Sequence, residues 1–307
     1  MSKPIVKPWL FYALSVTVLW GVWGALIEFP EQSGFPATLS YVVWSMTLIP
    51  VTIYALSRNN WKLDFNKSAV FYGMTAGFLG CGGQLILFQA LNFTPAYLFF
   101  PIISLNPAIT IILSVLIIKE KASRLAWIGI FLALCAILML SYQEPGSNGS
   151  ESSIWLLIAI LISAMWGTQA FVIKHGSSVS KTGSMQAESI VFYTMVSSII
   201  LIPFALMMTD FTADINWGLH GMYSAAAIQS LNAVGFLFFA LAIRYGKAII
   251  VVPLMNASAP VVTVILSLII YAVLPHPVIL AGMLVAFIAI YLMTREEAAM
   301  ESTSEDE

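Results

Sequence analysis

The chain has 307 residues, of which 60% are hydrophobic and 9% are charged, and its net charge at pH 7 is −2. Soluble globular domains carry about 25% charged residues, so this composition excludes a water-soluble fold and indicates a protein that lies in a lipid bilayer. The 13 Lys and Arg residues argue against a nucleic-acid partner, because such binding needs a dense basic surface.

Ten apolar segments follow one another along the chain, each close to the roughly 20 residues that a helix needs to cross a bilayer. Nine segments are the main alternative, because the boundaries near Pro95 and Arg244 are weak. Lys3 and Lys7 precede the first segment as in a signal peptide, but no small-residue cleavage site follows, so we expect a retained helix. The segments cover residues 9–29, 37–56, 69–91, 95–118, 123–142, 154–174, 185–208, 218–243, 247–272 and 275–293.

The distribution of charge predicts how these segments are oriented. Cytoplasmic loops accumulate Lys and Arg, and with a cytoplasmic N terminus all 13 of these residues fall on the cytoplasmic side. We therefore expect a multi-pass protein of the cell membrane with both termini in the cytoplasm. Residues 295–307 are expected to form a disordered, solvated acidic tail. The opposite loops carry only acidic charges, at Glu31, Glu144, Glu151, Asp210 and Asp214.

Residue patterns in the first half of the chain return in the second half. The first segment contains Trp20-Gly21, and the sixth contains Trp166-Gly167. Each half holds five segments, an odd number, so equivalent helices cross the membrane in opposite directions. Four further residues recur 153 positions later, namely Pro107, Thr110, Ser114 and Gly129 as Pro260, Thr263, Ser267 and Gly282.

These repeats predict an all-α membrane protein of ten transmembrane helices, arranged as two inverted five-helix repeats. The first repeat covers residues 1–142, an extracytoplasmic linker rich in Gly and Ser covers residues 143–153, and the second repeat covers residues 154–294. Inverted repeats are typical of secondary transporters, which bind substrate near the middle of the membrane and rock one half against the other.

Several of these motifs resemble the EamA branch of the drug/metabolite transporter (DMT) superfamily. They are the Trp-Gly pair in the first helix of each half, the Pro followed by Thr in the fourth, and Lys119-Glu120-Lys121 ahead of Trp127-Ile128-Gly129. The resemblance covers residues 9–293, although Lys119 stands where the family typically has Gly, and Val273 replaces the acidic residue in the second half. It implies a carrier for small solutes, often an exporter of amino acids or other metabolites.

Polar side chains near the middle of the segments are candidates for a substrate site, because an unpaired polar group is costly in hydrocarbon. Central Trp residues also need a reason, since Trp favours the membrane interface. Two interpretations stay open: these side chains line a cavity and contact substrate, or they pack between helices. No Lys or Arg lies near a segment centre, which argues against phosphorylated cargo. The candidates are Trp20, Trp23, Gln84, Asn106, Trp166, Gln169, Gln229, Asn232 and Asn256.

Three further residues concern movement and coupling. Pro107 and Pro260 each interrupt a helix near its centre and free a backbone carbonyl, which indicates either a gating helix break or a packing kink. Glu28 lies near the end of the first segment, where its carboxyl could relay protons or could simply lie at the membrane interface.

Together these features predict a secondary transporter that moves a small uncharged or zwitterionic metabolite, amino acid-like or aromatic, by alternating access, with export favoured. A multidrug exporter and a passive solute channel are the alternatives. We expect no enzyme activity, because no facing carboxylates, nucleophile with a base, or His cluster lies at membrane depth. We expect no cofactor and no metal. The expected partners are a small-molecule substrate, the lipid bilayer and, through Glu28, protons, with the chain acting as a monomer or homodimer.

Overall fold

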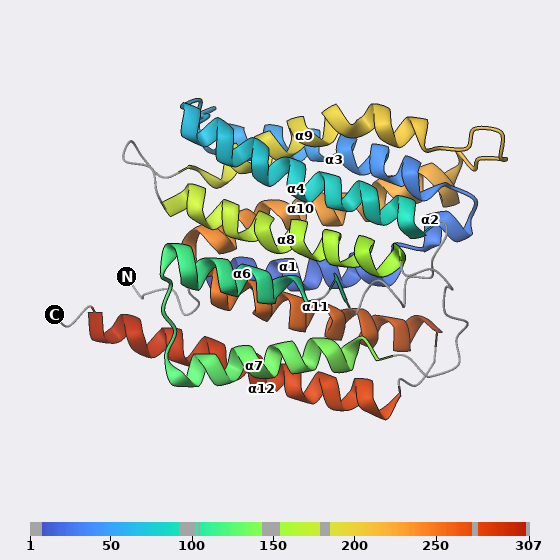
Figure 1. Cartoon of the computed structure of the whole chain (residues 1–307). Coiled ribbons are helices and arrows are strands. Elements are labelled where there is room, and N and C mark those ends of the chain that lie inside the picture. The colour runs from blue at the N-terminus through green and yellow to red at the C-terminus, as the bar shows by residue number, and fades with distance from the viewer. Residues whose placement is uncertain are drawn as a thin grey trace.

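The computed structural model describes residues 8–91, 102–103, 105–142, 154–178, 185–271 and 276–304. Every regular element in these ranges is helical, and the helices run along one common direction as a bundle (Figure 1). Apolar segments fold this way because a helix satisfies its own backbone hydrogen bonds, as a lipid environment requires. The described part of the chain is thus an all-helical, multi-pass membrane fold.

The helices follow the predicted apolar segments in chain order. Ser123 caps the N-terminal end of α7, because its side chain accepts a hydrogen bond from the backbone N–H of Ala126. The elements of the first half are α1 (Pro8–Leu26), α2 (Phe29–Gln32), α3 (Ala37–Arg58), α4 (Lys67–Leu91), α6 (Asn106–Leu113), the π-helical turn η1 (Ser114–Ile118) and α7 (Arg124–Leu140).

The second half repeats this order of long apolar helices. Its third long helix, α10, begins with a π-helical turn, η2. The elements are α8 (Ile154–Ser178), α9 (Ala187–Met207), η2 (Leu219–Tyr223), α10 (Ser224–Tyr245), α11 (Ala248–Tyr271) and α12 (Pro277–Ser304).

Eight of the described helices are long and apolar enough to cross a membrane. Two shorter apolar helices, Asn106–Ile118 and Arg124–Leu140, fall where the fourth and fifth segments are predicted. The prediction of an all-helical multi-pass protein is therefore confirmed, whereas the count of ten crossings and the cytoplasmic position of both termini remain predictions. Residues 143–153, the predicted linker, lie outside the described residues.

The acidic tail differs from its prediction. Residues 295–307 are expected to be disordered, but α12 continues as a helix as far as Ser304. The physical reason is local propensity, because this stretch begins with Glu296-Glu297-Ala298-Ala299-Met300, and Glu, Ala and Met are all good helix formers.

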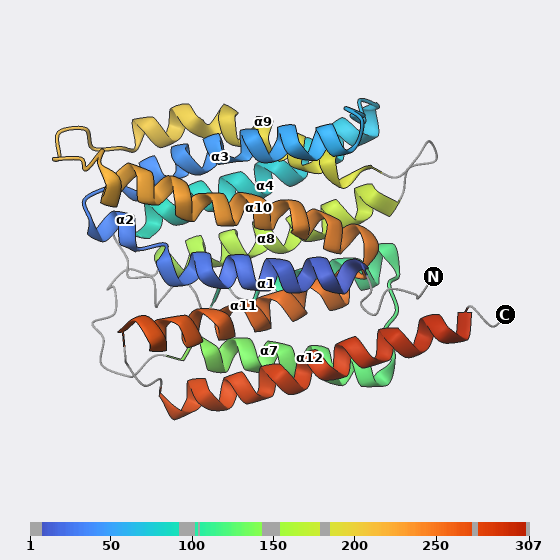
Figure 2. The ribbon, with the colours of Figure 1, turned by 180° about the vertical axis from the view of Figure 1, so that it is seen from behind.

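Each edge of the bundle pairs one helix from each half of the chain. Helices α7 and α12 lie side by side at one edge, and α3 and α9 lie at the opposite edge (Figures 1 and 2). Glycines allow the close approach of α7 and α12: Gly129 faces Met293, and Gly282 faces Met139. The two halves are thus interleaved at both edges of the bundle.

At the centre of the bundle, helices of one half also pack against helices of the other half. Helix α1 packs against α10 and α11 of the second half, and α8 packs against α4 and α6 of the first. The beginning of α1 and the end of α12 lie at the same end of the bundle (Figure 2). We call this the terminal end.

Candidate functional site

Three of the candidate residues lie at the middle of long apolar helices. Trp20 is at the midpoint of the 25-residue apolar stretch Pro8–Gln32, and Trp166 is at the midpoint of the 25-residue stretch Ile154–Ser178. Asn232 is at the midpoint of the 27 residues of Leu219–Tyr245. In a bilayer these positions lie at the depth where polar groups are most costly.

One group of candidates joins α1, α3 and α10. The Trp20 indole Nε1 donates to the backbone carbonyl of Asn232 (3.3 Å), and the Trp23 indole Nε1 donates to Oε1 of Gln229 (3.0 Å). The Trp44 indole Nε1 donates to Oδ1 of Asn232 (2.8 Å). Three indoles therefore donate to two residues of α10, two of them to amide side chains and one to a backbone carbonyl. We call Trp20, Trp23, Trp44, Gln229 and Asn232 the α10 cluster.

Trp44 is absent from the sequence-based candidates, although it is buried and holds one of the two amides. The signal that identifies Trp20 and Trp166, a Trp near the centre of an apolar segment, applies equally to Trp44 in segment 37–56. Its partner on α10 could not be identified from spacing, because the two residues are 188 positions apart.

A second group of candidates joins α4, α6, α8 and α11. The Trp166 indole Nε1 donates to the backbone carbonyl of Gly80 (3.2 Å), and the Gln169 side chain packs directly over Gly80. Nδ2 of Asn106 donates to Oδ1 of Asn256 (3.3 Å), so α6 and α11 are joined at the two asparagines.

Gln84 on α4 and Gln169 on α8 are buried and stand apart from the hydrogen-bonded candidates. Among the residues that the structure describes, neither amide side chain has a hydrogen-bond partner. Buried amides normally find partners, so these two differ from the amides that join helices.

The contacts of the two Trp-Gly pairs are equivalent. A Cβ added to Gly235 would lie 2.4 Å from Nε1 of Trp20, and a Cβ added to Gly83 would lie 2.6 Å from Nε1 of Trp166. Each central indole therefore lies directly against a glycine of the other half, at a distance that no larger residue permits.

The recurring threonines make equivalent contacts as well. Thr110 Oγ1 donates to the carbonyl of Gly167 (2.8 Å), and Thr263 Oγ1 donates to the carbonyl of Gly21 (2.9 Å). Each bond joins the fourth helix of one half to the first helix of the other half. The motif residues shared by the two halves are thus the residues through which the halves meet.

The two prolines differ in their effect. Pro107 lies in the first turn of α6 and has no backbone N–H to donate to the carbonyl of Ile103. Nδ2 of Asn106 donates to that carbonyl instead (3.1 Å). Pro260, by contrast, lies inside α11, which continues through it. The predicted interruption at Pro260 is therefore a missing backbone hydrogen bond within a continuous helix.

Glu28 lies beyond the end of α1, at the start of the short helix α2, and is exposed. Its carboxylate accepts a hydrogen bond from Nε2 of Gln32 (3.4 Å). Of the two predicted roles, this position favours a residue at the membrane interface over a relay beside Trp20.

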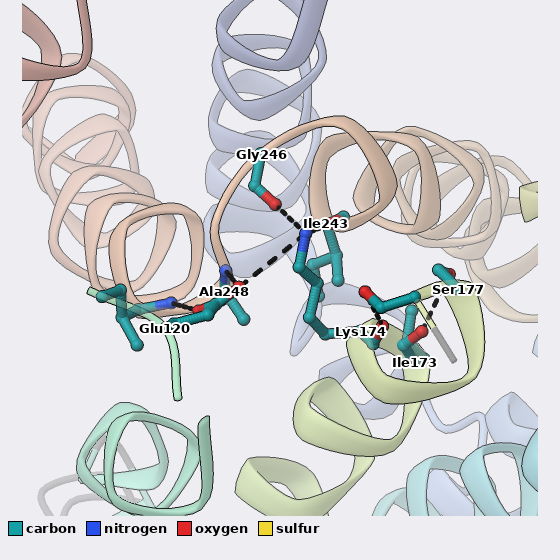
Figure 3. A network of polar contacts seen from close by, with 9 residues as sticks. Glu120, Ile173, Lys174, Ser177, Ile243, Gly246 and Ala248 are labelled. Atoms are coloured by element: carbon teal, nitrogen blue, oxygen red, sulfur yellow. Dashed lines mark hydrogen bonds and ion pairs between the residues drawn. The ribbon is translucent and has the colours of Figure 1, made fainter. Parts of the chain in front are cut away.

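A charged network joins the two halves at the terminal end (Figure 3). The Glu120 carboxylate accepts hydrogen bonds from the backbone N–H groups of Ala248 (3.2 Å) and Ile249 (3.1 Å), at the first turn of α11. Nζ of Lys174, at the end of α8, lies 3.7 Å from the same carboxylate and donates to the carbonyl of Gly246 (2.6 Å). The Glu120 and Lys174 side chains are only 7% and 14% exposed.

The backbone at Lys119 explains the geometry of this network. Lys119 has φ = 60°, a left-handed conformation that side chains disfavour and glycine accepts freely. The residue reverses the chain after η1 and turns Glu120 toward α11. The family resemblance expects Gly at position 119, and the conformation supplies the physical reason for that preference. Sequence reasoning did not pair Glu120 with Lys174.

Comparison with known protein families identifies one match across the chain. The sequence profile of the EamA-like transporter family matches residues 7–142 and 153–295.

Within the described part of the chain, no three His, Cys, Asp or Glu side chains gather closely enough to hold a metal ion.

Individual proteins are similar to the chain as well. Protein RarD of Streptomyces exfoliatus is 24% identical over 245 residues, which are 76% of this chain and 71% of that protein. An uncharacterized protein of Methanocaldococcus jannaschii is 37% identical over 79 residues, 26% of this chain and 58% of that protein. One solved crystal structure superposes with a TM-score of 0.76 at 14% identity, covering 93% of this chain and 95% of the other. That structural likeness concerns the fold alone.

Proposed function

The chain belongs to the EamA-like transporter family and is a multi-pass membrane transporter, and from this premise we propose that it is a secondary carrier that works by alternating access. Its proposed cargo is a small uncharged or zwitterionic metabolite, amino acid-like or aromatic, and the proposed direction is export. The direction follows the family resemblance.

The observation that carries this proposal is the equivalence of the contacts between the two halves. Thr110 and Thr263 each donate to a glycine carbonyl of the opposite half, at 2.8 and 2.9 Å. Each half consists of five segments, and the two halves meet through equivalent contacts. A single rocking motion can therefore convert an arrangement open to one side of the membrane into the equivalent arrangement open to the other side. Alternating access needs two such arrangements, and a passive channel does not.

The network at the terminal end supports the same mechanism. Glu120, Lys174 and the first turn of α11 join the two halves at that end. In alternating access, these contacts must break when the terminal end opens. They must stay intact while the opposite end is open. We place this end, and both termini, on the cytoplasmic face of the cell membrane, in agreement with the distribution of basic residues.

The chemistry of the central groups supports the proposed cargo. Amides and indoles supply neutral donors, acceptors and aromatic faces, which suit an uncharged or zwitterionic solute. The cations Lys174 and Arg244 lie at helix ends, where they donate to backbone carbonyls. Glu28 is exposed beyond α1, so proton coupling through it is the less supported role. The carrier contacts lipid and substrate, and the proposal holds for a monomer or a homodimer.

Counterflow in proteoliposomes tests the proposal. Vesicles are preloaded with one unlabelled solute at a time, drawn from amino acids, sugars, nucleosides and aromatic cations, and uptake of the labelled solute is measured. We expect saturable accumulation of one class, reduced at least tenfold when Trp20→Ala and Asn106→Ala are combined. Trp61→Ala, at an exposed position outside the site, is the matched control.

Each other outcome identifies an alternative. Non-saturable flux without counterflow indicates a passive channel, because a channel does not exchange solute against its gradient. Counterflow of chemically unrelated solutes indicates a multidrug exporter. Absence of any counterflow by folded protein contradicts the proposed function.

A further inference from the structure

The indoles of the α10 cluster fix the orientation of both amides. An indole N–H can only donate, so the amide atom that faces it must be the oxygen. Trp23 Nε1 lies 3.0 Å from Oε1 of Gln229, and Trp44 Nε1 lies 2.8 Å from Oδ1 of Asn232. A flipped amide would place NH2 against N–H. Each amide oxygen therefore faces an indole, and both NH2 groups point elsewhere.

The two NH2 groups have no acceptor in the described part of the chain. Gln229 is 1% exposed, and its Nε2 is a buried donor without a hydrogen-bond partner. Asn232 is 9% exposed, and its Nδ2 donates to no described residue. Such groups are rare in proteins because each carries a desolvation cost, so each needs an explanation.

The position of these donors points to a ligand. Gln229 and Asn232 are three residues apart on α10, and residues at that spacing share one face of a helix. They lie near the middle of the apolar stretch Leu219–Tyr245. Helices α1, α3 and α10 contain no Asp or Glu, so none of the three helices offers the NH2 groups a carboxylate of its own.

We propose that the NH2 groups of Gln229 and Asn232 form a donor subsite that binds the hydrogen-bond acceptor of the cargo, a carboxylate or carbonyl group. The indoles of Trp23 and Trp44 are positioning groups: they donate to the amide oxygens and so fix the orientation in which the NH2 groups face the cargo. This inference rests on the proposed carrier function and names the part of the cargo that the site recognises. It favours solutes with a carboxylate or carboxamide over amines that lack an acceptor.

A matched series of solutes tests the subsite. The compounds are phenylalanine, phenylalaninamide and phenethylamine, together with alanine, alaninamide and ethylamine, which share a side chain but differ in the acceptor. Binding is measured by ligand-induced thermal stabilisation of the purified full chain. We expect the acids and amides to bind at least tenfold more tightly than the amines.

Gln229→Glu gives a change of preference that structural damage would not give. The new carboxyl still accepts from Trp23, and in its ionised form it presents an acceptor where the wild type presents a donor, so binding is measured at mildly alkaline pH. We expect at least a tenfold loss of binding for the acids and no loss for the amines. Gln89→Glu, an amide-to-acid change on α4 outside the cluster, is the matched control and should leave the preference unchanged. Asn232→Asp, which also keeps its contact with Trp44, supplies a second variant if Gln229→Glu does not fold.

Three outcomes overturn the inference. The first is equal binding of amines and acids by the wild type, which would mean that the NH2 groups serve packing or an ordered water. The second is an equal loss of every solute in Gln229→Glu. The third is that none of the six compounds binds while another solute without an acceptor shows counterflow, which leaves the carrier function standing. Absence of both binding and counterflow for every solute contradicts the inference and the proposed function together.

Discussion

At the scale of single residues, the protein uses glycine to bring aromatic rings to the centre of the bundle. Gly83 and Gly235 leave room for the indoles of Trp166 and Trp20, and each indole N–H then reaches a backbone carbonyl. A large side chain opposite either ring would move the ring and break the hydrogen bond at the same time.

We predict that Gly235→Ala and Gly83→Ala each destabilise the protein by about 1–3 kcal/mol, because the new methyl group would overlap an indole. Thermal unfolding in detergent measures the effect. Gly82→Ala is the control, since its Cβ would meet only the flexible end of Met165, at 3.0 Å. Equal stability of Gly235→Ala and Gly82→Ala would show that Trp20 has other room to occupy.

The threonine pair allows a matched comparison between the halves. Thr110→Val and Thr263→Val each remove one hydrogen bond to a glycine carbonyl while keeping the side-chain shape. We expect each to lower the free energy of unfolding by about 0.6–2 kcal/mol, the range measured for hydrogen bonds between membrane helices. A large difference between the two variants, measured by thermal unfolding, would contradict the equivalence of the two contacts.

Lys119 gives a prediction in the stabilising direction. Because its φ of 60° costs an ordinary side chain about 1–2 kcal/mol and costs glycine little, we expect Lys119→Gly to raise the midpoint of thermal unfolding. Lys119→Val should lower it, since a branched side chain fits this conformation poorly. If Lys119→Gly unfolded at a lower temperature than the wild type, the left-handed turn would not be the reason for the glycine preference at this position.

At the scale of helices, the first turn of α11 is held by a residue from the other half of the chain. The Glu120 carboxylate occupies the N–H groups of Ala248 and Ile249, which would otherwise lack partners, and its negative charge matches the positive end of the helix dipole. Lys174 neutralises the same carboxylate from α8. One acidic side chain therefore contacts both α8 and α11.

We expect Glu120→Gln to open the terminal end more often, because the amide keeps the size of the side chain and loses the charge. Labelling of a reporter cysteine measures the opening: Ser177→Cys, in a chain without Cys81 and Cys135, is buried near the network. Its labelling by a hydrophilic maleimide should be several times faster in Glu120→Gln. Lys121→Gln, which removes an exposed charge nearby, should label at the wild-type rate. Equal rates in all three proteins would exclude a closing role for Glu120.

Sequence patterns predicted the helices well and their partners poorly. Apolar length located the segments because the bilayer sets the length of a helix, and the recurring Trp-Gly and Thr residues proved to be contacts between the halves. Trp44 and the Glu120–Lys174 pair were missed as partners, because their contacts join positions far apart in the chain. Propensity also decided the end of α12, where acidic charge at the chain end predicted a disordered tail.

At the scale of the whole molecule, the two halves share the same contacts at the centre and differ just after their fourth helices. The Thr-Gly bonds occur once in each direction across the bundle. The charged network rests on Glu120, and position 273, which corresponds to it in the second half, is Val. Equivalent centres allow two arrangements of the halves, and the network favours the one that is closed at the terminal end.

The most direct test of alternating access is to lock that end reversibly and measure transport. Glu120→Cys and Lys174→Cys are combined in a chain without native cysteines, linked with a short bis-methanethiosulfonate, which forms a reducible disulfide with each thiol and releases sulfinate, and assayed by counterflow before linking, after linking and after reduction. Alternating access predicts that linking lowers counterflow to background and that reduction restores the rate of the unlinked double variant. Each single-cysteine variant should be unaffected by the reagent. Counterflow that continues at the unlinked rate in fully linked protein would show that the terminal end does not open during transport, and would contradict the mechanism.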